Sequence, residues 1–349
     1  MIPVAPPTEE NLSLAARALA QGGLVSFPTE TVYGLGANAL DPMALARIFE
    51  AKRRPFFDPL IVHIAHRSSL EILCASAPTR RGHTLPGGEG GTGYSDPRAE
   101  KLMDRFWPGP LTLVFPKSGA VPDLATSGLP TVAVRMPAHP VALELIRRAG
   151  FPVAAPSANP FGRLSPTTAG HVRDQFREGI ELILDGGPCS VGVESTILSL
   201  AGETPVLLRA GGLAREEIEA LIGPVADAAS FQARPQSPGQ LPGHYAPRTR
   251  LRLLRGSGSA DLSGPASGAA RIGYLGFRSV PADGGFAAAE ILSASGDMRE
   301  AAANLFACLH RLDRLELDLI LAESLPEKGL GLAIMDRLGK AETGSARDP

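Results

Sequence analysis

The sequence predicts an α/β protein of two domains, the larger of which is built on a twisted, mostly mixed open sheet with helices and a concave pocket. Its 349 residues exceed what one ordinary core holds. Short apolar runs alternate with segments in which apolar residues recur at helical spacing, which is typical of an α/β chain. Connections of hairpin length and of helix length both occur, and this mixture favours a mixed sheet over a purely parallel one.

Capping and turn residues mark the first elements. Thr8 can cap a helix that a glycine pair at 22–23 ends. The apolar run 24–27 then predicts a short buried strand. Asp41 followed by Pro42 predicts the start of a second helix, because a capping side chain and a proline at the first helical position favour the same boundary.

The remaining elements of the larger domain follow from the same two periodicities. Alternating or continuous apolar runs predict strands, and apolar residues three or four apart predict helices. The expected strands cover 59–64, 111–115, 131–137, 153–159, 180–184, 194–198 and 206–209, and the expected helices cover 140–149 and 215–222.

Residues 74–98 interrupt this pattern and predict a flexible surface insertion, because they lack periodicity and are rich in glycine. Within them, 88–93 matches the G-x-G-x-x-G pattern of dinucleotide-binding loops. In proteins that use it, that loop follows a strand and opens a helix. Neither element is predicted here, so we interpret the match as coincidental.

The rest of the chain predicts a linker and a smaller α/β domain. The linker is stiffened by proline and carries Gln, His and Tyr residues, which favours a docked conformation. Asp297 and Glu300 predict a capping box at the start of the clearest helix. We expect a catalytic domain at 8–223, a linker at 224–247 that docks over the active site, a small domain at 248–340 with strands near 251–254, 271–277 and 317–322, and a tail at 341–349.

Composition excludes several classes of protein. The 34 basic and 36 acidic residues nearly balance, so strong direct nucleic-acid binding is not expected. No apolar run is long enough to cross a bilayer, and the first residues lack the features of a secretion signal. Three cysteines lie far apart, which suits reduced thiols that serve packing. We expect a cytoplasmic protein with no membrane partner.

The stretch 26–36 is the first candidate for a functional site. Thr29, Glu30, Thr31 and Tyr33 follow a buried strand directly, and the ends of strands are where ligands gather in open α/β sheets. An ordinary strand and turn is the alternative. From this stretch alone, the two interpretations carry equal weight.

The same arrangement recurs at other predicted strand ends, where hydroxyls, an amide and cations follow short buried strands. If these ends converge, they form one polar, cationic pocket. Such a pocket, without a nucleophile, suits a reaction between bound substrates that carry phosphates and carboxylates. Singly, each residue has a structural alternative as a salt bridge, a turn hydroxyl or a helix end. The residues are Thr29, Thr31, Lys52, Arg54, Arg135, Ser157, Asn159, Ser195, Thr196 and Arg209.

Other kinds of site have less support in the sequence. There is no Walker phosphate loop and no Ser-His-Asp arrangement of the nucleophile-elbow type. His63 and His66 lack the spacing and partners of a closed metal site, so no tightly bound, protein-ligated metal is expected.

Several sequence blocks, in order, resemble the YrdC-like family. The linker segments and the C-terminal segment resemble the two-domain form of that family. Together the blocks span about residues 10–340. They are 27–36, 52–55, 59–63, 107–112, 132–137, 155–159 and 192–196, with 237–239, 244–247 and 329–338 for the two-domain form.

This resemblance implies a YrdC-like sheet, a smaller Rossmann-like C-terminal domain, and L-threonylcarbamoyladenylate synthase activity. In that reaction L-threonine, bicarbonate and ATP give threonylcarbamoyl-AMP and pyrophosphate, with Mg²⁺ accompanying ATP. A separate tRNA threonylcarbamoyl transferase complex then passes the group to the adenosine beside the anticodon. The enzyme would be a nucleotidyltransferase of tRNA processing.

The resemblance also implies roles for individual residues, carried over by matching motif. Arg135 can hold the threonine carboxylate in a bidentate fork, and Lys52 with Arg54 can face the phosphates as the catalytic pair. Which group accepts the proton of the amine stays open. Threonine contacts are expected from Thr29, His63, Arg135, Ala155 and Ser195, and ATP contacts from Lys52, Arg54, Thr131, Ser157, Ser165, Arg209 and Tyr245.

Two alternatives remain. The first is a carbamoyl-transferring module like that of hydrogenase maturation proteins, which carry acylphosphatase and zinc-finger segments that this sequence lacks. The second is an RNA-binding module, against which the balanced charge and the lack of interleaved aromatic and basic residues count.

Overall fold

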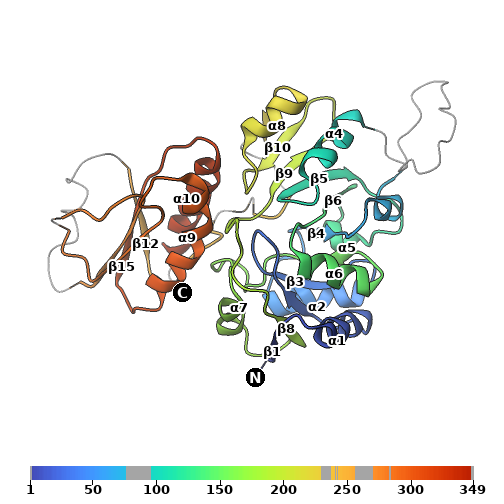
Figure 1. Ribbon diagram of the computed structural model, residues 1–349, viewed down its shortest axis with the longest axis horizontal. Coiled ribbons are helices and arrows are strands. Elements are labelled where there is room, and N and C mark those ends of the chain that lie inside the picture. The colour runs from blue at the N-terminus through green and yellow to red at the C-terminus, as the bar shows by residue number, and fades with distance from the viewer. Residues whose placement is uncertain are drawn as a thin grey trace.

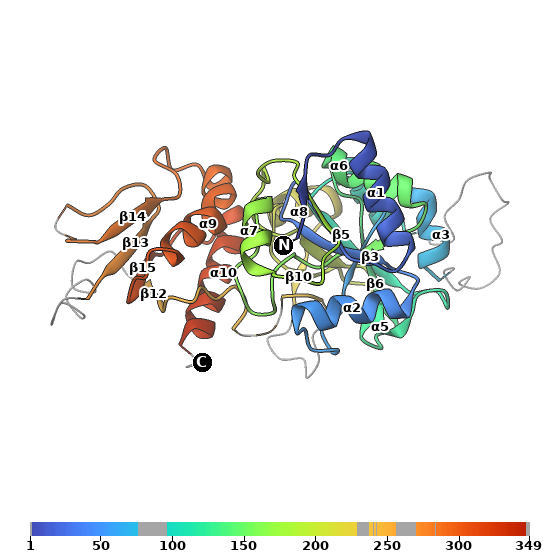
Figure 2. The same cartoon turned by 90° about the horizontal axis from the view of Figure 1, so that it is seen from below.

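Two sheets organise the protein in the computed structural model, which describes residues 2–75, 96–228, 237–239, 241, 243–255, 270–282 and 284–346. One sheet has eleven strands and the other has four. In both views the helices α9 (Met298–Asp313) and α10 (Leu330–Ser345) lie between the smaller sheet and the larger domain (Figures 1 and 2). The predicted α/β fold class with a second α/β domain is confirmed.

The larger sheet is mixed, with parallel and antiparallel pairs interspersed along the order β1-β8-β2-β3-β7-β4-β6-β5-β9-β10-β11. Its strands are short, as the glycine- and proline-rich sequence suggests. They are β1 (Val4–Ala5), β2 (Val25–Phe27), β3 (Gly34–Asn38), β4 (Ile61–His63), β5 (Leu111–Pro116), β6 (Thr131–Arg135), β7 (Val153–Ala154), β8 (Leu182–Leu184), β9 (Thr196–Ser199), β10 (Val206–Arg209) and β11 (Ala226–Asp227).

The predicted caps start the first two helices. The Thr8 hydroxyl accepts a hydrogen bond from the backbone N–H of Asn11, and the Asp41 carboxylate accepts one from Met43. The helices of this domain are α1 (Glu9–Ala20), α2 (Pro42–Lys52), α3 (Leu70–Leu73), α4 (Pro97–Phe106), α5 (Asp123–Thr126), α6 (Pro140–Ala149), α7 (Ala169–Gln175) and α8 (Arg215–Ile222), with a 3₁₀ turn η1 (Arg67–Ser69).

The two ends of the expected insertion 74–98 belong to regular structure. Cys74 bridges to Lys117 beside β5, and Asp96 caps α4, which begins at Pro97. A cap followed by proline is the same signal that starts α2, but here it stands at the end of a glycine-rich segment without periodicity, which masked it. The glycine-rich match at 88–93 lies outside the described residues.

The glycines of the stretch 26–36 lie within a strand and serve close packing. Gly34 and Gly36 lie in β3, which pairs with β2. A Cβ on Gly36 would stand 2.7 Å from the Phe27 ring and 2.9 Å from Val153. Glycine is therefore required there for close packing between strands.

Alternation along the central strands separates the core face of the sheet from its pocket face. Val62 of β4 packs in the main core, whereas Ile61 belongs to a small cluster on the other face. His63 shares the face of Ile61 and pairs with Arg135 across the parallel β4–β6 ladder. On this same face α1 and α6 cover only the part near β2, β7 and β8, which leaves the middle strands open for a pocket.

The smaller sheet is parallel throughout, in the order β12-β15-β13-β14. Its strands are β12 (Leu251–Leu254), β13 (Ile272–Gly276), β14 (Ala288–Ile291) and β15 (Leu319–Glu323). The sequence did not predict β14, because Ala288–Ile291 has few strand-favouring residues.

The predicted capping box at α9 forms only in part. Asp297 accepts hydrogen bonds from the backbone N–H groups of Arg299 and Glu300, as expected. The Glu300 carboxylate does not reach back to Asp297, since it accepts from the hydroxyls of Ser293 and Ser295, and Ser293 in turn accepts from Asp297 N–H. Among the described residues, no helix is both long and apolar enough to cross a membrane.

Candidate active site

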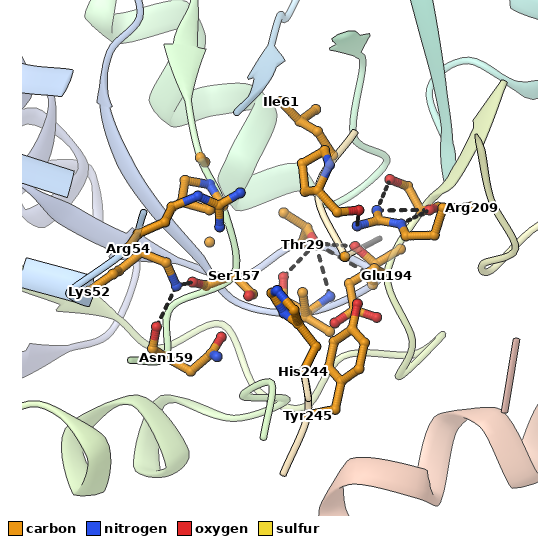
Figure 3. A pocket seen from close by; sticks show the side chains of 18 of the residues that line it. Thr29, Lys52, Arg54, Ile61, Ser157, Asn159, Glu194, Arg209, His244 and Tyr245 are labelled. Carbon is orange, nitrogen blue, oxygen red and sulfur yellow. Dashed lines mark hydrogen bonds between the residues drawn. The ribbon is translucent and has the colours of Figure 1, made fainter. Parts of the chain in front are cut away.

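The pocket face of the larger sheet carries a concave site that gathers residues from distant parts of the chain (Figure 3). Side chains reach it from the β2–β3 turn, the end of α2, the central strands and the linker. Its lining comprises Thr29, Thr31, Val32, Gly34, Lys52, Arg54, Ile61, His63, Arg135, Ala155, Pro156, Ser157, Asn159, Phe161, Gly162, Glu194, Ser195, Arg209, Pro238, Gly239, His244 and Tyr245.

Two buried cations enter the pocket from the end of α2. The Lys52 ammonium donates to the carbonyl oxygens of Ser157, at 2.5 Å, and of Asn159. Burial, with Arg54 nearby, holds the pKa of Lys52 well below its usual value. Arg54 is paired with the Asp58 carboxylate at 2.9 Å and also donates to the Asp58 carbonyl. Both side chains are thus fixed in place before any ligand binds.

Arg135 stands at the end of β6 in a similarly fixed position. Its guanidinium donates to Glu30 at 2.7 Å, to the Thr31 hydroxyl at 2.8 Å and to the Gly109 carbonyl at 3.2 Å. These bonds use one N–H of each nitrogen, and a guanidinium carries two further N–H groups. His63 beside it is buried, its Nδ1 has no hydrogen-bond partner, and burial together with Arg135 lowers its pKa to about 3. The imidazole is therefore neutral at pH 7.

The Thr29 hydroxyl serves a turn and also faces the pocket. It donates to the Val32 carbonyl at 2.6 Å and accepts from the backbone N–H groups of Thr31 and Val32. These bonds are those of a hydroxyl-capped turn. The same residue lines the pocket, so the two interpretations of this stretch describe one structure.

Arg209 reaches the pocket because of a β-bulge in β10. The register of β10 against β9 shifts between Leu207 and Arg209, which places Arg209 opposite Ile197. From there its guanidinium donates to the Ser195 carbonyl at 2.9 Å and to the Ser195 hydroxyl at 3.1 Å. The Ser195 hydroxyl also bonds the Thr112 hydroxyl at 2.8 Å.

The linker closes one side of the pocket. Gly239 has a φ of +82°, and a Cβ there would stand 2.7 Å from the Tyr245 hydroxyl and 3.3 Å from Arg209. Tyr245 adopts a φ of 63°, which is uncommon for a residue with a side chain and typical of functional sites. His244 packs edge-on against Phe161, and burial, together with the nearby Arg54, lowers its pKa to about 3.

Three acidic groups pair with cations in or behind the site, and none of them was predicted to contact a substrate. Glu194 lines the pocket, whereas Glu30 and Asp58 stand outside its lining. Glu30 pairs with Arg135, Asp58 pairs with Arg54, and Glu194 pairs with Arg337 from the small domain. Glu30 belongs to the candidate stretch 26–36, and Glu194 stands next to Ser195 in the chain. That adjacency was the available signal. His244 and Asn159 also line the pocket without having been assigned a contact.

Of the twelve residues with predicted ligand contacts, ten line this pocket and two do not. Thr131 begins β6, at the end of the strand away from Arg135. Ser165 is buried, and its hydroxyl donates to Glu194 at 2.5 Å, so it stands behind the lining. Thr196, which was predicted to join the pocket as a strand-end hydroxyl, also lies outside the lining, since its hydroxyl donates to the Leu213 carbonyl. The pocket brings together Thr29, Lys52, Arg54, His63, Arg135, Ala155, Ser157, Ser195, Arg209 and Tyr245. The ligand contacts of all twelve residues stay predictions.

Chemically, the pocket offers fixed cations, hydroxyls and neutral imidazoles. Fixed cations stabilise developing phosphate charge because they need no reorganisation. Among the described residues, no three His, Cys, Asp or Glu side chains gather as a metal ion requires. The site is therefore suited to binding charged substrates side by side.

Two family models together match nearly the whole chain. The Sua5/YciO/YrdC model, described as "Telomere recombination", matches residues 17–211. A model described as "Threonylcarbamoyl-AMP synthase, C-terminal domain" matches residues 213–343. The chain belongs to the threonylcarbamoyl-AMP synthase family. It is therefore an enzyme of that family, and the predicted family and activity class are confirmed.

Individual members of the threonylcarbamoyl-AMP synthase family align over almost their full length. The protein of Pyrococcus abyssi is 45% identical over 344 residues, covering 95% of this chain and 94% of its own. The protein of Bacillus subtilis is 43% identical and covers 96% of this chain and 94% of its own. The crystal structure of P. abyssi Sua5 complexed with L-threonine superposes with a TM-score of 0.85 at 42% identity, covering 99% and 98% of the two chains.

Proposed function

We propose that this enzyme joins L-threonine, bicarbonate and ATP into threonylcarbamoyl-AMP, with release of pyrophosphate and water. The threonine amine loses a proton and captures bicarbonate as a carbamate, with loss of water. A carbamate oxygen then forms a bond to the α-phosphorus of ATP, and the bond from that phosphorus to the pyrophosphate oxygen breaks. The name of the family and the threonine complex of its P. abyssi member support this proposal.

The observation that carries the proposal is the division of the pocket's cations into two sets, Lys52 with Arg54 at the end of α2 and Arg135 at the end of β6. Lys52 and Arg54 offer buried positive charge suited to the phosphates of ATP. Arg135, with N–H groups to spare beside neutral His63 and the hydroxyls of Thr29 and Ser195, suits the carboxylate and hydroxyl of a small amino acid. Phosphate and carboxylate ends are what this reaction must hold together.

The assigned ATP and threonine contacts follow this division. We assign the threonine side to Thr29, His63, Arg135, Ala155 and Ser195. We assign the ATP side to Lys52, Arg54, Ser157, Arg209 and Tyr245, with Thr131 and Ser165 acting from outside the lining.

Mg²⁺ would enter with ATP. Because Mg²⁺ in nucleotide sites is held mainly by phosphate oxygens and water, with one or two carboxylates, a dedicated cage is not required. Of the acidic groups near the site, Asp58 is fully buried and paired with Arg54, and Glu194 is bonded to Arg337 and Ser165, so phosphate oxygens and water would be the main ligands of the ion. The ion would supply charge neutralisation at the phosphates.

The product would serve a separate tRNA threonylcarbamoyl transferase complex, which modifies the adenosine beside the anticodon. Threonylcarbamoyl-AMP is a reactive mixed anhydride, so a second enzyme is needed to consume it. The nearly balanced charge of the chain supports a division in which tRNA binds to that complex.

The test is to incubate the protein with ATP, Mg²⁺, L-threonine and labelled bicarbonate and to measure pyrophosphate and labelled nucleotide. We expect both products only when threonine is present. Lys52→Met should abolish them, whereas Lys117→Met should not, because Lys117 makes a surface pair with Asp123 away from the pocket lining. Pyrophosphate release that is independent of threonine would contradict the proposal.

A further inference from the structure

The helix α10 of the small domain places a buried cation directly behind the pocket wall. Arg337 is fully buried, with no exposed side-chain surface. Its Nε donates to Glu194 at 3.0 Å, and its Nη1 donates to the Ala210 carbonyl at 2.6 Å and to Asp336 at 2.9 Å. An arginine buried this deeply is rare unless it is paired.

Glu194 is the pocket residue that Arg337 holds. One carboxylate oxygen accepts from Arg337, and the other accepts from the Ser165 hydroxyl at 2.5 Å. Burial alone would raise the pKa of Glu194, but Arg337, Arg209 and the Ser165 bond keep it below its usual value. Glu194 is therefore an ionised group inside the protein, and its orientation is fixed from both sides.

The same helix touches the part of the pocket that the linker forms. The Arg337 guanidinium carbon lies 5.3 Å from the centre of the Tyr245 ring, within range of a cation–π contact. One turn further along, Lys340 donates to the Gly239 carbonyl at 2.7 Å. Glu194, Tyr245 and Gly239 all line the pocket, so α10 contacts three of its lining residues.

We propose that Arg337 is a positioning residue of the enzyme, which acts through Glu194 and Tyr245 to hold the ATP-binding wall of the pocket in its binding form. The proposal rests on the proposed function for the identity of the nucleotide. Its contacts lead to Ser165 and Tyr245, which we assign to ATP, and within the part of the chain that the structure describes no hydrogen bond joins Arg337 or Glu194 to Arg135 or His63 on the threonine side.

The alternative is that Arg337 merely fastens the two domains together. If Arg337 only held the two domains together, its loss would lower stability and raise the KM values for ATP and threonine alike. If it positions the pocket wall, its loss should weaken ATP binding more than threonine binding. A second ion pair between the same two domains serves as the comparison. Arg299 on α9 pairs with Glu217 on α8 at 3.6 Å, across the same two domains, but with exposed side chains and away from the pocket lining.

The experiment is a double-mutant cycle on the full-length protein. The variants are Arg337→Met, Glu194→Gln and the two combined, with Arg337→Lys to keep the charge and Arg299→Met as the control. The dissociation constant of an ATP analogue with an α,β-methylene bridge is measured by calorimetry, since that bridge prevents pyrophosphate release. KM values for ATP and threonine and the thermal unfolding temperature are measured alongside.

We expect Arg337→Met to weaken binding of the analogue by about tenfold or more, the factor that corresponds to losing a charge-assisted hydrogen bond. The KM for threonine should rise by less than that for ATP. The double variant should bind the analogue better than the product of the two single effects implies, because no unpaired charge remains. Arg337→Lys should lose less than Arg337→Met, and Arg299→Met should leave all binding values unchanged.

Effects of Arg337→Met and Glu194→Gln that simply multiply, or equal rises in both KM values, would overturn the proposal. If Arg337→Met does not fold, Arg337→Lys and Glu194→Gln carry the same comparison of ATP with threonine. Wild-type protein that binds the analogue but forms no threonylcarbamoyl nucleotide would contradict the proposed function, while the binding cycle would still decide the role of Arg337.

Discussion

Replacing Arg135 by alanine should separate its role in folding from its role in binding threonine. Arg135 is 3% exposed and pairs with Glu30, which is 7% exposed. Without the guanidinium, that buried carboxylate keeps only the Ala138 N–H, which donates to it at 3.0 Å. Breaking a buried pair by removing one partner lowers the free energy of unfolding by about 3–5 kcal/mol.

The binding effect is worked from the bond that threonine would lose. A charge-assisted hydrogen bond to its carboxylate is worth about 1.5–3 kcal/mol, which corresponds to a rise of roughly 10- to 150-fold in the threonine KM. The KM for ATP should change far less, because Lys52 and Arg54 stay in place. The assay is the initial rate of pyrophosphate release with each substrate varied in turn.

A second substitution distinguishes the two effects. In Arg135→Ala combined with Glu30→Gln, no buried charge is left unpaired, so much of the lost stability should return while the threonine KM stays high. Arg47→Ala is the control, because Arg47 pairs with Glu181 at a half-exposed surface position where such pairs contribute about 0–1 kcal/mol. If the double variant regained the threonine KM, or if the ATP KM rose as much as that for threonine, the assignment of Arg135 would be wrong.

Three further predictions follow from other buried groups. Tyr33 is fully buried, and its hydroxyl donates to the Gly187 carbonyl at 2.8 Å. Tyr33→Phe should therefore lower the free energy of unfolding, measured by denaturant titration, by about 1–3 kcal/mol. Both KM values should stay unchanged, because Tyr33 is not in the pocket lining. Burial lowers the pKa of His63, His171 and His244 to about 3. The unfolded chain therefore takes up protons that the native protein does not as the pH falls below about 6.5, and stability should decrease by about 1.4 kcal/mol per pH unit for each such histidine; denaturant midpoints that do not move between about pH 7 and about pH 5 would contradict this. Chelation of Mg²⁺ should stop pyrophosphate release without lowering the unfolding temperature, because the ion would be held through ATP, and a destabilised chelated protein would instead indicate a structural metal.

Helix starts and strands could be predicted because capping and alternation depend on residues only a few positions apart in the chain. Thr8 and Asp41 fix helix starts through bonds to backbone groups two or three residues away. Alternation over a few residues likewise identified the strands that carry His63 and Arg135. Within residues 74–98 the lack of periodicity and the many glycines masked the cap at Asp96.

Several residues of the site could also be predicted from the sequence, because motifs that resemble those of the family place them next to strand ends. The sequence by itself determined the family, the mixed α/β class and most of the side chains that line the pocket. Their partners could not be read in the same way. Glu30 and Arg135 are 105 residues apart, and Glu194 and Arg337 are 143 residues apart.

Only the tertiary structure decided which charges meet and which way they face. Strict alternation would direct Arg209 to the face opposite Leu208, but the bulge in β10 turns it to the pocket beside Ser195. Thr131 shares a strand with Arg135 and yet lies outside the pocket lining, because a strand carries its two ends to different places. Periodicity and capping are local properties of the chain, whereas a pairing such as that of Glu194 with Arg337 depends on the path of the whole fold.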